Sequence, residues 1–283
     1  MLILFPCEYG SIQKIEEDYR LEYEEAIKNG FDVLLFNYDD FLWSKKLKLN
    51  KSIEFDCVEK VLYRGWMMKY EDYSALYNSL SKLNLQLINT PDEYRNCHEF
   101  YYSYNKIKEH TPRSIFYPQG TSIDWDYIKN SFERFLVKDY VKSVKGFNFP
   151  SYFDNSYENS QLDSFIKQFI DIRGDLYTGG IAIKEYVDLD KTDNIPHEFR
   201  AFYYNKELLI IYQNSENYDD NLPLDFACNI PILNSNFYTV DFAILENGEI
   251  VIIETGDGQV SGISNESKIS DFYSCLKISL NKN

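Results

Sequence analysis

The stretch Tyr238-Thr-Val-Asp-Phe-Ala-Ile-Leu-Glu-Asn-Gly-Glu-Ile-Val-Ile-Ile-Glu254 carries the most structural information in this sequence. Two apolar runs flank Asn247-Gly248, the dipeptide favoured in two-residue type I′ turns because both central residues take positive φ. We therefore predict a tight β-hairpin. Counting outward from that turn gives these cross-strand pairs: Glu246 with Glu249, Leu245 with Ile250, Ala243 with Ile252, and Asp241 with Glu254.

On this register two carboxylates stand directly opposite each other. Directly opposed residues have Cβ atoms roughly 4.5–5.5 Å apart, and like charges so placed destabilise a sheet. Both faces of the hairpin are apolar, so the sheet is expected to be covered on both sides, where solvent screens the pair poorly. Either one acid is protonated or a divalent cation bridges Asp241 and Glu254.

We favour Mg²⁺, because every candidate ligand is a hard oxygen and Thr255-Gly-Asp-Gly-Gln259 adds further oxygens on a loop. In the alternative interpretation, the acids merely reach solvent at the open end of the hairpin. A turn of another length would shift the register and separate them.

Composition restricts the class of protein. The 283 residues carry a net charge of −16, which opposes binding to nucleic acid. Aromatic residues make up 17% of the chain, as expected of a folded globular protein. The five cysteines are scattered without C-x-x-C spacing, and no apolar stretch approaches the ~20 residues of a membrane span. We predict a cytoplasmic protein with reduced thiols and neither a nucleic-acid nor a membrane partner.

The first part of the chain alternates between strands and helices. Strands are predicted at residues 2–6, 31–36, 58–63 and 86–88, and helices at 16–28 and 71–83. Thr90 is a suitable cap for a further helix that begins with Pro91. This alternation predicts a parallel sheet, so residues 1–105 are expected to form a Rossmann-like α/β lobe. No G-x-G-x-x-G follows the first strand, and a dinucleotide site is unsupported.

From Thr111-Pro112 onward the pattern changes to longer strands and hairpins. We predict strands at residues 114–117, 135–138, 180–187, 198–204 and 207–213, followed by the acid hairpin, with a single helix at 162–173. Antiparallel strands around an inserted helix predict an α+β second part with mostly antiparallel sheets, covering residues 106–283.

Basic residues near the predicted strands are candidates for holding an anion that binds with Mg²⁺. Lys138 ends an apolar run, and Lys142, Ser143 and Lys145 follow at close spacing, which is typical of a phosphate-covering loop. A solvated basic turn is the alternative interpretation. Arg200, in Glu198-Phe-Arg200, would suit bidentate contact with a phosphate, although a surface ion pair with Glu198 is the other choice.

Residues for substrate recognition are expected outside the hairpin. Arg64 follows a buried strand of the first lobe, where open α/β sheets bind ligands, and it would hold a substrate carboxylate unless it only bridges the lobes. Gln259 and Ser261 offer polar contacts on the glycine-containing loop after Glu254. His98, His110 and His197 are all interpreted as structural, with His197 the most plausible exception because it precedes the Glu198 strand.

Taken together, these segments resemble the ATP-grasp superfamily over roughly residues 106–260. The resemblance rests on Val137-Lys138, on Ile183-Lys184-Glu185-Tyr-Val187, on Glu198-Phe-Arg200, and on Asp241 with Glu254, which occur in the family's order. In that family a strand ending in Lys precedes a mobile phosphate loop, a hinge strand meets the adenine, and the acids hold Mg²⁺. Within it, the chain looks most like small bacterial and phage clades whose substrates are mostly unassigned.

The sequence departs from the family pattern after Glu254. The usual Glu-x-Asn is replaced by Glu254-Thr-Gly256, so Asp257 or Gln259 would have to supply the further metal ligand. A second phosphate-contacting lysine is not evident, with Lys106 as a candidate.

The resemblance implies an ATP- and Mg²⁺-dependent ligase that joins a carboxylate to an amine through an acylphosphate, with small-molecule or peptide substrates. Residues 106–187 would cover the nucleotide and residues 188–283 would bind the metal. A phosphotransferase acting on a hydroxyl and a non-catalytic nucleotide sensor are the alternatives. The implied site comprises catalytic Lys138 and Arg200; nucleotide-binding Lys142, Ser143, Lys145, Glu185, Tyr186 and Val187; metal-binding Asp241, Glu254 and Asp257; and substrate-binding Arg64, Gln259 and Ser261.

Overall fold

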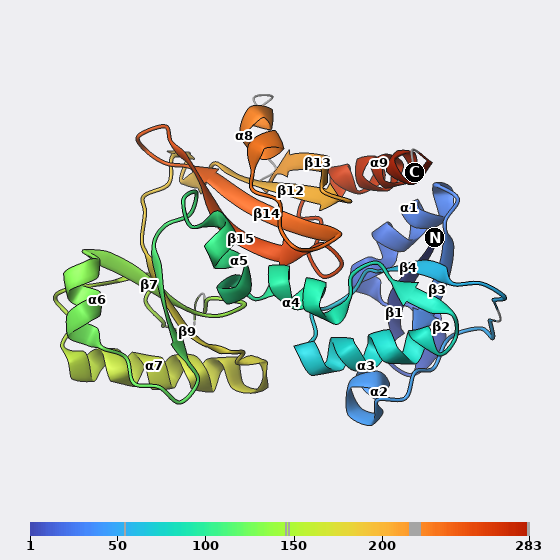
Figure 1. Cartoon of the computed structure of the whole chain (residues 1–283), viewed down its shortest axis with the longest axis horizontal. Helices are drawn as coiled ribbons and strands as arrows, with labels where there is room; N and C mark the ends of the chain where they lie inside the picture. The colour runs from blue at the N-terminus through green and yellow to red at the C-terminus, as the bar shows by residue number, and fades with distance from the viewer. Residues whose placement is uncertain (54, 145, 147, 215–221, 282–283) are drawn as a thin grey trace.

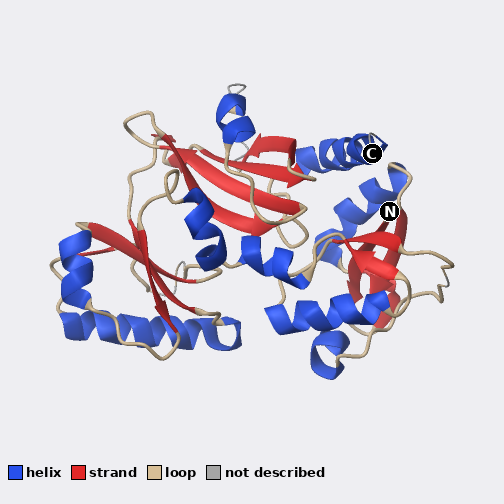
Figure 2. Cartoon of the chain, in the orientation of Figure 1, coloured by secondary structure: helices blue, strands red, loops and turns tan. Residues whose placement is uncertain are grey.

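The computed structural model describes residues 1–53, 55–144, 146, 148–214 and 222–281. Within these residues the chain forms one five-stranded sheet, two four-stranded sheets and a two-stranded ribbon. The three larger sheets lie in separate parts of the molecule, with helices α4 and α5 between them (Figure 1). Figure 2 shows helices against each of these sheets.

The first sheet is built from the N-terminal strands and is mostly parallel. β1 (Leu2–Glu8) pairs in parallel with β3 (Asp32–Phe36) and β4 (Glu59–Tyr63), and β4 pairs in parallel with β5 (Leu85–Leu87). The predicted parallel sheet is thus present. An antiparallel strand, β2 (Ser11–Ile15), was not predicted. The helices of this part are α1 (Arg20–Lys28), α2 (Tyr38–Ser44) and α3 (Tyr70–Ser81), with the 3₁₀ turn η1 (Glu17–Tyr19).

Helix α4 (Pro91–His98) begins as the sequence predicts. The Thr90 side chain accepts a hydrogen bond from Glu93 N, the Glu93 side chain accepts one from Thr90 N, and Pro91 occupies the first turn. This capping box satisfies two amide groups that the helix itself leaves without partners. Helix α5 (Phe100–Ile107) follows after Glu99, whose extended backbone (φ −95°, ψ 108°) separates the two helices.

The second sheet has the strand order β6-β9-β7-β8 and is antiparallel throughout. Its apolar face packs on α6 and α7 through an aromatic cluster that includes Trp125, Phe135, Phe153 and Phe169. The elements are β6 (Ser114–Pro118), α6 (Trp125–Ser131), β7 (Arg134–Asp139), β8 (Phe153–Asp154), α7 (Asn159–Arg173), η2 (Gly174–Leu176) and β9 (Gly180–Glu185).

The third sheet has the order β13-β12-β14-β15 and is also antiparallel. Phe202 packs with Phe272 of the last helix on one face, and Phe199 belongs to the cluster that contains Phe100 on the other. Both faces are therefore covered, as expected from the apolar hairpin. The elements are β10 (Lys191–Thr192), β11 (Ile195–Pro196), β12 (Glu198–Tyr204), β13 (Glu207–Gln213), α8 (Leu224–Asn229), β14 (Phe237–Ile244), β15 (Ile250–Asp257), η3 (Glu266–Lys268) and α9 (Ile269–Asn281).

The turn of the acid hairpin differs from the prediction, yet the acid pair is where it was predicted. Gly248 has a positive φ of 85° but Asn247 does not, and Ile244 pairs with Ile250, so the connection is not a two-residue type I′ turn. An irregularity between Asp241 and Phe242 then restores the register. Because the two deviations cancel, Asp241 lies opposite Glu254.

The prediction of a single helix after residue 106 was wrong. Helices α6, α8 and α9 were missed because two are short and the third was not recognised from its pattern. In α9 the buried residues Ile269, Phe272, Tyr273 and Leu276 have the i, i+3, i+4, i+7 spacing of an amphipathic helix. This helix packs on α1, which brings the end of the described chain back to the first sheet (Figure 1). No helix in the described residues is long and apolar enough to span a membrane.

Candidate functional site

The acid pair of the hairpin is held by basic residues on both sides. Arg200 of β12 lies directly across from Asp241 on β14, and its Nε and Nη2 donate hydrogen bonds of 2.7 and 2.6 Å to the two oxygens of that carboxylate. This is the bidentate geometry that arginine favours. The partner of Arg200 shown here is thus Asp241, rather than the Glu198 considered from the sequence.

Glu254 is held by lysines of the second sheet. Lys138, at the end of β7, donates a 3.0 Å hydrogen bond to Glu254 Oε1, and Lys142 Nζ lies 3.5 Å from Oε2. Burial alone would raise the pKa of Glu254, but the charges of Lys138 and Lys142 outweigh it and hold this pKa well below its usual range. The acids are therefore both accommodated as carboxylates by basic side chains, a possibility that the sequence argument did not consider.

The turn that carries Lys142 is fixed by Asp139. The Asp139 carboxylate is fully buried, accepts hydrogen bonds from Val141 N (2.7 Å) and Lys142 N (2.6 Å), and pairs with Arg173 Nε at 2.8 Å. Ser143 forms a bridge back to Lys138 but is exposed. The start of the predicted phosphate loop is consequently a tight turn. Lys145 lies outside the described residues.

A lysine that the sequence argument did not select lies beside Lys138. Lys184 of β9 is buried, and its Nζ donates to Ile253 O at 2.6 Å and to Thr111 Oγ1 at 3.2 Å. Burial lowers the pKa of Lys184 to about 7, and the neighbouring Lys138 charge lowers it further, against the opposing effect of Glu254. The available sequence signal was a lysine within the otherwise apolar start of this strand, Gly180-Ile-Ala-Ile-Lys184.

The ring of Phe100 lies between the two lysines. Lys138 Nζ is 5.0 Å and Lys184 Nζ 4.7 Å from its centroid, both within the range of a cation–π contact. Phe100 begins α5, and its backbone N donates to Tyr140 O at 2.6 Å. The candidate second lysine from the sequence, Lys106, is exposed on the same helix.

The site therefore carries more positive than negative charge. Four basic side chains, Lys138, Lys142, Lys184 and Arg200, surround the two carboxylates. This excess stands out in a chain of net charge −16. Such a site is suited to an anion with several oxygens, because charge-assisted hydrogen bonds to phosphate groups would use the surplus cations.

The predicted hinge residues lie at the end of β9. Glu185 pairs with Arg113, with Nε–Oε2 at 3.3 Å, and its backbone N donates to Arg113 O. The Tyr186 ring lies 4.6 Å from that of Tyr152, and its backbone N donates to Arg134 O. Val187 follows and is half-buried.

Arg64 lies away from the acid pair and is fully engaged by the protein. Its Nε and Nη2 donate 2.8 Å hydrogen bonds to Glu22, and its Nη1 donates to the carbonyls of Gly258 and Ser261. Tyr273 also donates to Glu22 at 2.8 Å. Only 1% of Arg64 is exposed. This geometry differs from the predicted substrate contact, and Arg64 instead joins the first sheet to the loop after β15.

Asp257, Gln259 and Ser261 are also placed differently from the prediction. Asp257 is fully buried and accepts hydrogen bonds from Asn89 Nδ2 and from Gln259 N at 2.9 Å. Gln259 Nε2 donates to Tyr73 at 2.7 Å, and Ser261 Oγ lies 2.8 Å from Thr239 Oγ1. Because Asp257 is three positions after Glu254, strand alternation directs it away from the acid pair. We call this group, with Arg64, Glu22 and Asn89, the interlock.

The three histidines differ in their surroundings. His197 faces Thr192 Oγ1 at 2.9 Å and Asp190 Oδ2 at 3.4 Å, in the ribbon region. His98 is instead 8% exposed at the end of α4, and its pKa is lowered to about 3 by burial and by Lys142 and Lys138. The choice of His197 as the most plausible functional histidine therefore pointed to the wrong place, since His98 is the one beside the cations.

The chemistry of the donors suits Mg²⁺ as a ligand shared with phosphates. Asp241 and Glu254 offer carboxylate oxygens side by side, which Mg²⁺ prefers in combination with phosphate oxygens and water. Within the described part of the chain no three His, Cys, Asp or Glu side chains are grouped as a metal centre. The residues present thus fit a cation held jointly by two carboxylates and a bound phosphate ester.

Comparison with solved structures identifies the fold. The chain aligns with the RimK domain protein ATP-grasp from Sphaerobacter thermophilus at 11% identity, covering 98% of each chain with a TM-score of 0.61. It aligns with the D-alanine–D-alanine ligase from Bacillus anthracis complexed with ATP at 11% identity, covering 99% of this chain and 98% of that one (TM-score 0.56). A third alignment is with the ATP-grasp ligase PsnB, complexed with a precursor variant, Mg and ADP (9% identity, 98% of each chain, TM-score 0.59). The fold is that of the ATP-grasp proteins.

The family itself follows from the sequence match. The model of an ATP-grasp domain family, the third family of its clade, matches residues 124–276, which is more than half of the chain. The chain therefore belongs to this family of ATP-grasp domains. None of the curated proteins matches it.

Proposed function

We propose that the protein is an ATP- and Mg²⁺-dependent ligase that joins a carboxylate to an amine through an acylphosphate. The observation that carries the proposal is the cluster of four basic side chains around two opposed carboxylates, where the second and third sheets meet. Membership of the ATP-grasp family supports it. The titles of its structural neighbours, which include ligases in complex with ATP or with Mg and ADP, are consistent with it.

The protein's own residues act by position and charge. Lys138, Lys142 and Lys184 would bind phosphate oxygens, and Arg200 would hold the transferred phosphoryl group. Asp241 and Glu254 would hold Mg²⁺, which supplies neutralisation of charge on the phosphates when bound. No protein nucleophile is required, because catalysis of phosphoryl transfer rests on alignment and electrostatic stabilisation.

The reaction balances in two steps. A substrate carboxylate oxygen attacks the terminal phosphorus, and the bond to ADP breaks with the electron pair leaving on ADP. The amine nitrogen then attacks the acyl carbon, inorganic phosphate leaves, and the nitrogen loses its proton. Exclusion of water from the buried cations would protect the acylphosphate from hydrolysis.

We also propose a division of labour along the chain. Residues 1–105 form the first lobe, residues 106–187 cover the nucleotide, and residues 188–283 bind the metal. Support comes from the sheets, since the strands of each larger sheet fall within one of these ranges. Glu185, Tyr186 and Val187 are proposed to meet the adenine, as they end the strand that carries Lys184.

The test is a thermal melt of wild type and Asp241→Asn, each with ATP alone, Mg²⁺ alone and both. A ligand that binds the native state raises the melting temperature by mass action. We expect wild type to rise strongly only with both, and Asp241→Asn to respond weakly. Asp188→Asn is the matched control, because it breaks an Arg–Asp pair with Arg134 outside the site.

Turnover decides the reaction class. ADP release that depends on both an acid and an amine, and that Asp241→Asn abolishes, would support the ligase. Full activity in Asp241→Asn would refute the assignment of the site. A stable phosphorylated product without an amide would identify a phosphotransferase, and ATP binding without ADP release across a broad panel would identify a nucleotide sensor.

A further inference from the structure

Two buried titratable side chains beside the cation cluster lack a polar partner among the described residues. His98 and Glu99 are each only 8% exposed, and neither side chain makes a hydrogen bond or ion pair with another residue that the structure describes. Other buried charged side chains do have partners: Glu22 holds Arg64, Asp139 holds Arg173, and Lys138 holds Glu254. Buried polar groups ordinarily find partners, so the two exceptions require an explanation.

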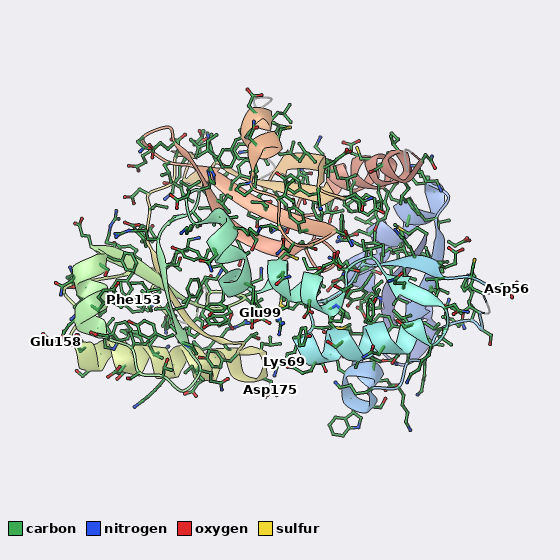
Figure 3. The ribbon with its side chains drawn as sticks, in the orientation of Figure 1. Asp56, Lys69, Glu99, Phe153, Glu158 and Asp175 are labelled. Atoms are coloured by element: carbon green, nitrogen blue, oxygen red, sulfur yellow. The ribbon has the colours of Figure 1, made fainter. Side chains whose placement is uncertain are left out.

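Both side chains remain accessible to a ligand. The side-chain atoms that are sealed from solvent and lack a partner, within the described ranges, are Glu25 Oε2 and Arg95 Nε. The polar atoms of His98 and Glu99 are therefore not sealed. They follow one another at the break between α4 and α5, the two helices that pack on β15. Figure 3 shows Glu99 near the middle of the molecule, below these helices.

The electrostatic surroundings of the two residues differ in a way that favours a cationic ligand. Burial raises the pKa of Glu99 to about 7, with Glu71 and Asp139 adding to the shift and Arg95 opposing it. Within the described chain, no cation forms an ion pair with Glu99. His98 faces Lys142 and Lys138, which keep its imidazole neutral, so it presents a hydrogen-bond acceptor beside the cation cluster.

We propose that His98 and Glu99 form the subsite for the primary ammonium group of the acceptor amine. Glu99 supplies the carboxylate that balances the ammonium charge, and His98 accepts one of its N–H donors on the side of Lys138 and Lys142. An anion would be repelled from Glu99, and a quaternary ammonium group would leave His98 without a donor. The word acceptor rests on the proposed ligase function, whereas the ammonium site itself does not.

The sequence makes a direct test feasible, because the chain contains only three histidines. With isotopically labelled imidazole nitrogens, NMR follows His98, His110 and His197 separately, and His98→Asn assigns the first. The titrant is n-butylammonium chloride, at constant ionic strength set with sodium chloride. Tetramethylammonium chloride is the matched probe, since it has the charge but no N–H group.

We expect saturable shifts of the His98 signals alone, with n-butylammonium and not with tetramethylammonium. In Glu99→Gln the midpoint should rise by about tenfold or more, because the charge-assisted contact is lost. Glu109→Gln, an exposed change beside His110, is the control and should leave the midpoint unchanged. Glu99→Asp, which retains the charge, should keep more affinity than Glu99→Gln.

The proposal is overturned if His98 shifts no more than the other two histidines, if tetramethylammonium acts equally, or if Glu99→Gln titrates like wild type. The ATP and Mg²⁺ melts of these variants separate this failure from that of the ligase. A normal nucleotide response without an amine response refutes only the subsite. An amine response lost in Glu99→Gln, without a nucleotide response, refutes the ligase and retains the subsite.

Discussion

Two buried clusters of charge, less than a strand's length apart on the same hairpin, differ in how completely they are satisfied. In the interlock, Arg64 directs all its donors to Glu22 and to two carbonyls, and Asp257 receives donors from Asn89 and Gln259. Around the acid pair, cations outnumber carboxylates, and the nearby His98 and Glu99 side chains have no polar partner in the described part of the chain.

The difference separates structure from function on physical grounds. A closed network gains nothing from a ligand, because every polar group already has a partner, and breaking it costs stability. An open cluster retains unmet charge that only a ligand can neutralise. Substitutions should therefore destabilise the fold in the interlock and weaken binding in the site.

The largest effect is expected for Arg64→Ala. It leaves the Glu22 carboxylate buried without its cation, which should cost about 3–5 kcal/mol in urea denaturation. Replacing both partners, as Arg64→Met with Glu22→Leu, should recover much of the loss, since two desolvated charges are removed together. A cost of the single change below about 1 kcal/mol would show that the interlock is not structural.

The pH dependence of stability tests Asp257. Burial raises its pKa to about 7 in the folded protein, against hydrogen bonds that lower it, from an ordinary value of 3.8. The folded state then binds more protons than the unfolded state, so this contribution is complete below about pH 4 and is lost as the pH rises through 7. Between about pH 4 and 8, Asp257→Asn should gain on wild type by up to about 4 kcal/mol in free energy of unfolding. Parallel stability curves for the two proteins would contradict the assignment.

Lys184→Met should separate binding from stability in the open cluster. We expect ATP affinity to fall by about a hundredfold, because one charge-assisted phosphate contact is lost from a buried position. Stability should change by less than about 1 kcal/mol, since a desolvated cation without a carboxylate of its own is removed. Calorimetric titration with ATP and Mg²⁺ measures the first, and Lys60→Met, an exposed lysine, is the control. Unchanged affinity would remove Lys184 from the site.

The smallest effect is expected for Asp139→Asn. The change weakens the turn that holds Lys142 in place, so ATP affinity should fall by about tenfold in the same titration. Asp154→Asn is the matched control, because Asp154 also accepts a backbone hydrogen bond in a turn, from Ser156 N, but on an exposed surface. Equal effects of the two variants would mean that the turn geometry around Lys142 is unimportant.

Much of the candidate site was foreseeable, but not its extent. Lys138, Arg200, Asp241 and Glu254 were selected from sequence, and the structure brings them together. Lys184, Phe100 and Asp139 were not, because a lysine in an apolar strand, a phenylalanine and an acid beside a lysine have no distinguishing local pattern. Arg64, Asp257, Gln259 and Ser261 were assigned to the site by their position in the chain, yet they belong to the interlock.

By itself, the sequence determined the local elements whose signals are local: the alternating strands and helices of the first sheet, the capping box at Thr90, and the apolar hairpin carrying two acids. These depend on periodicity and on contacts within a few residues. Only the tertiary structure decided which charges are satisfied. Partners such as Glu22 with Arg64, or Lys138 with Glu254, are far apart in the chain, and their pairing depends on how separate sheets pack. The irregularity at Asp241 shows the same limit, since it restores a register that the turn alone would have shifted.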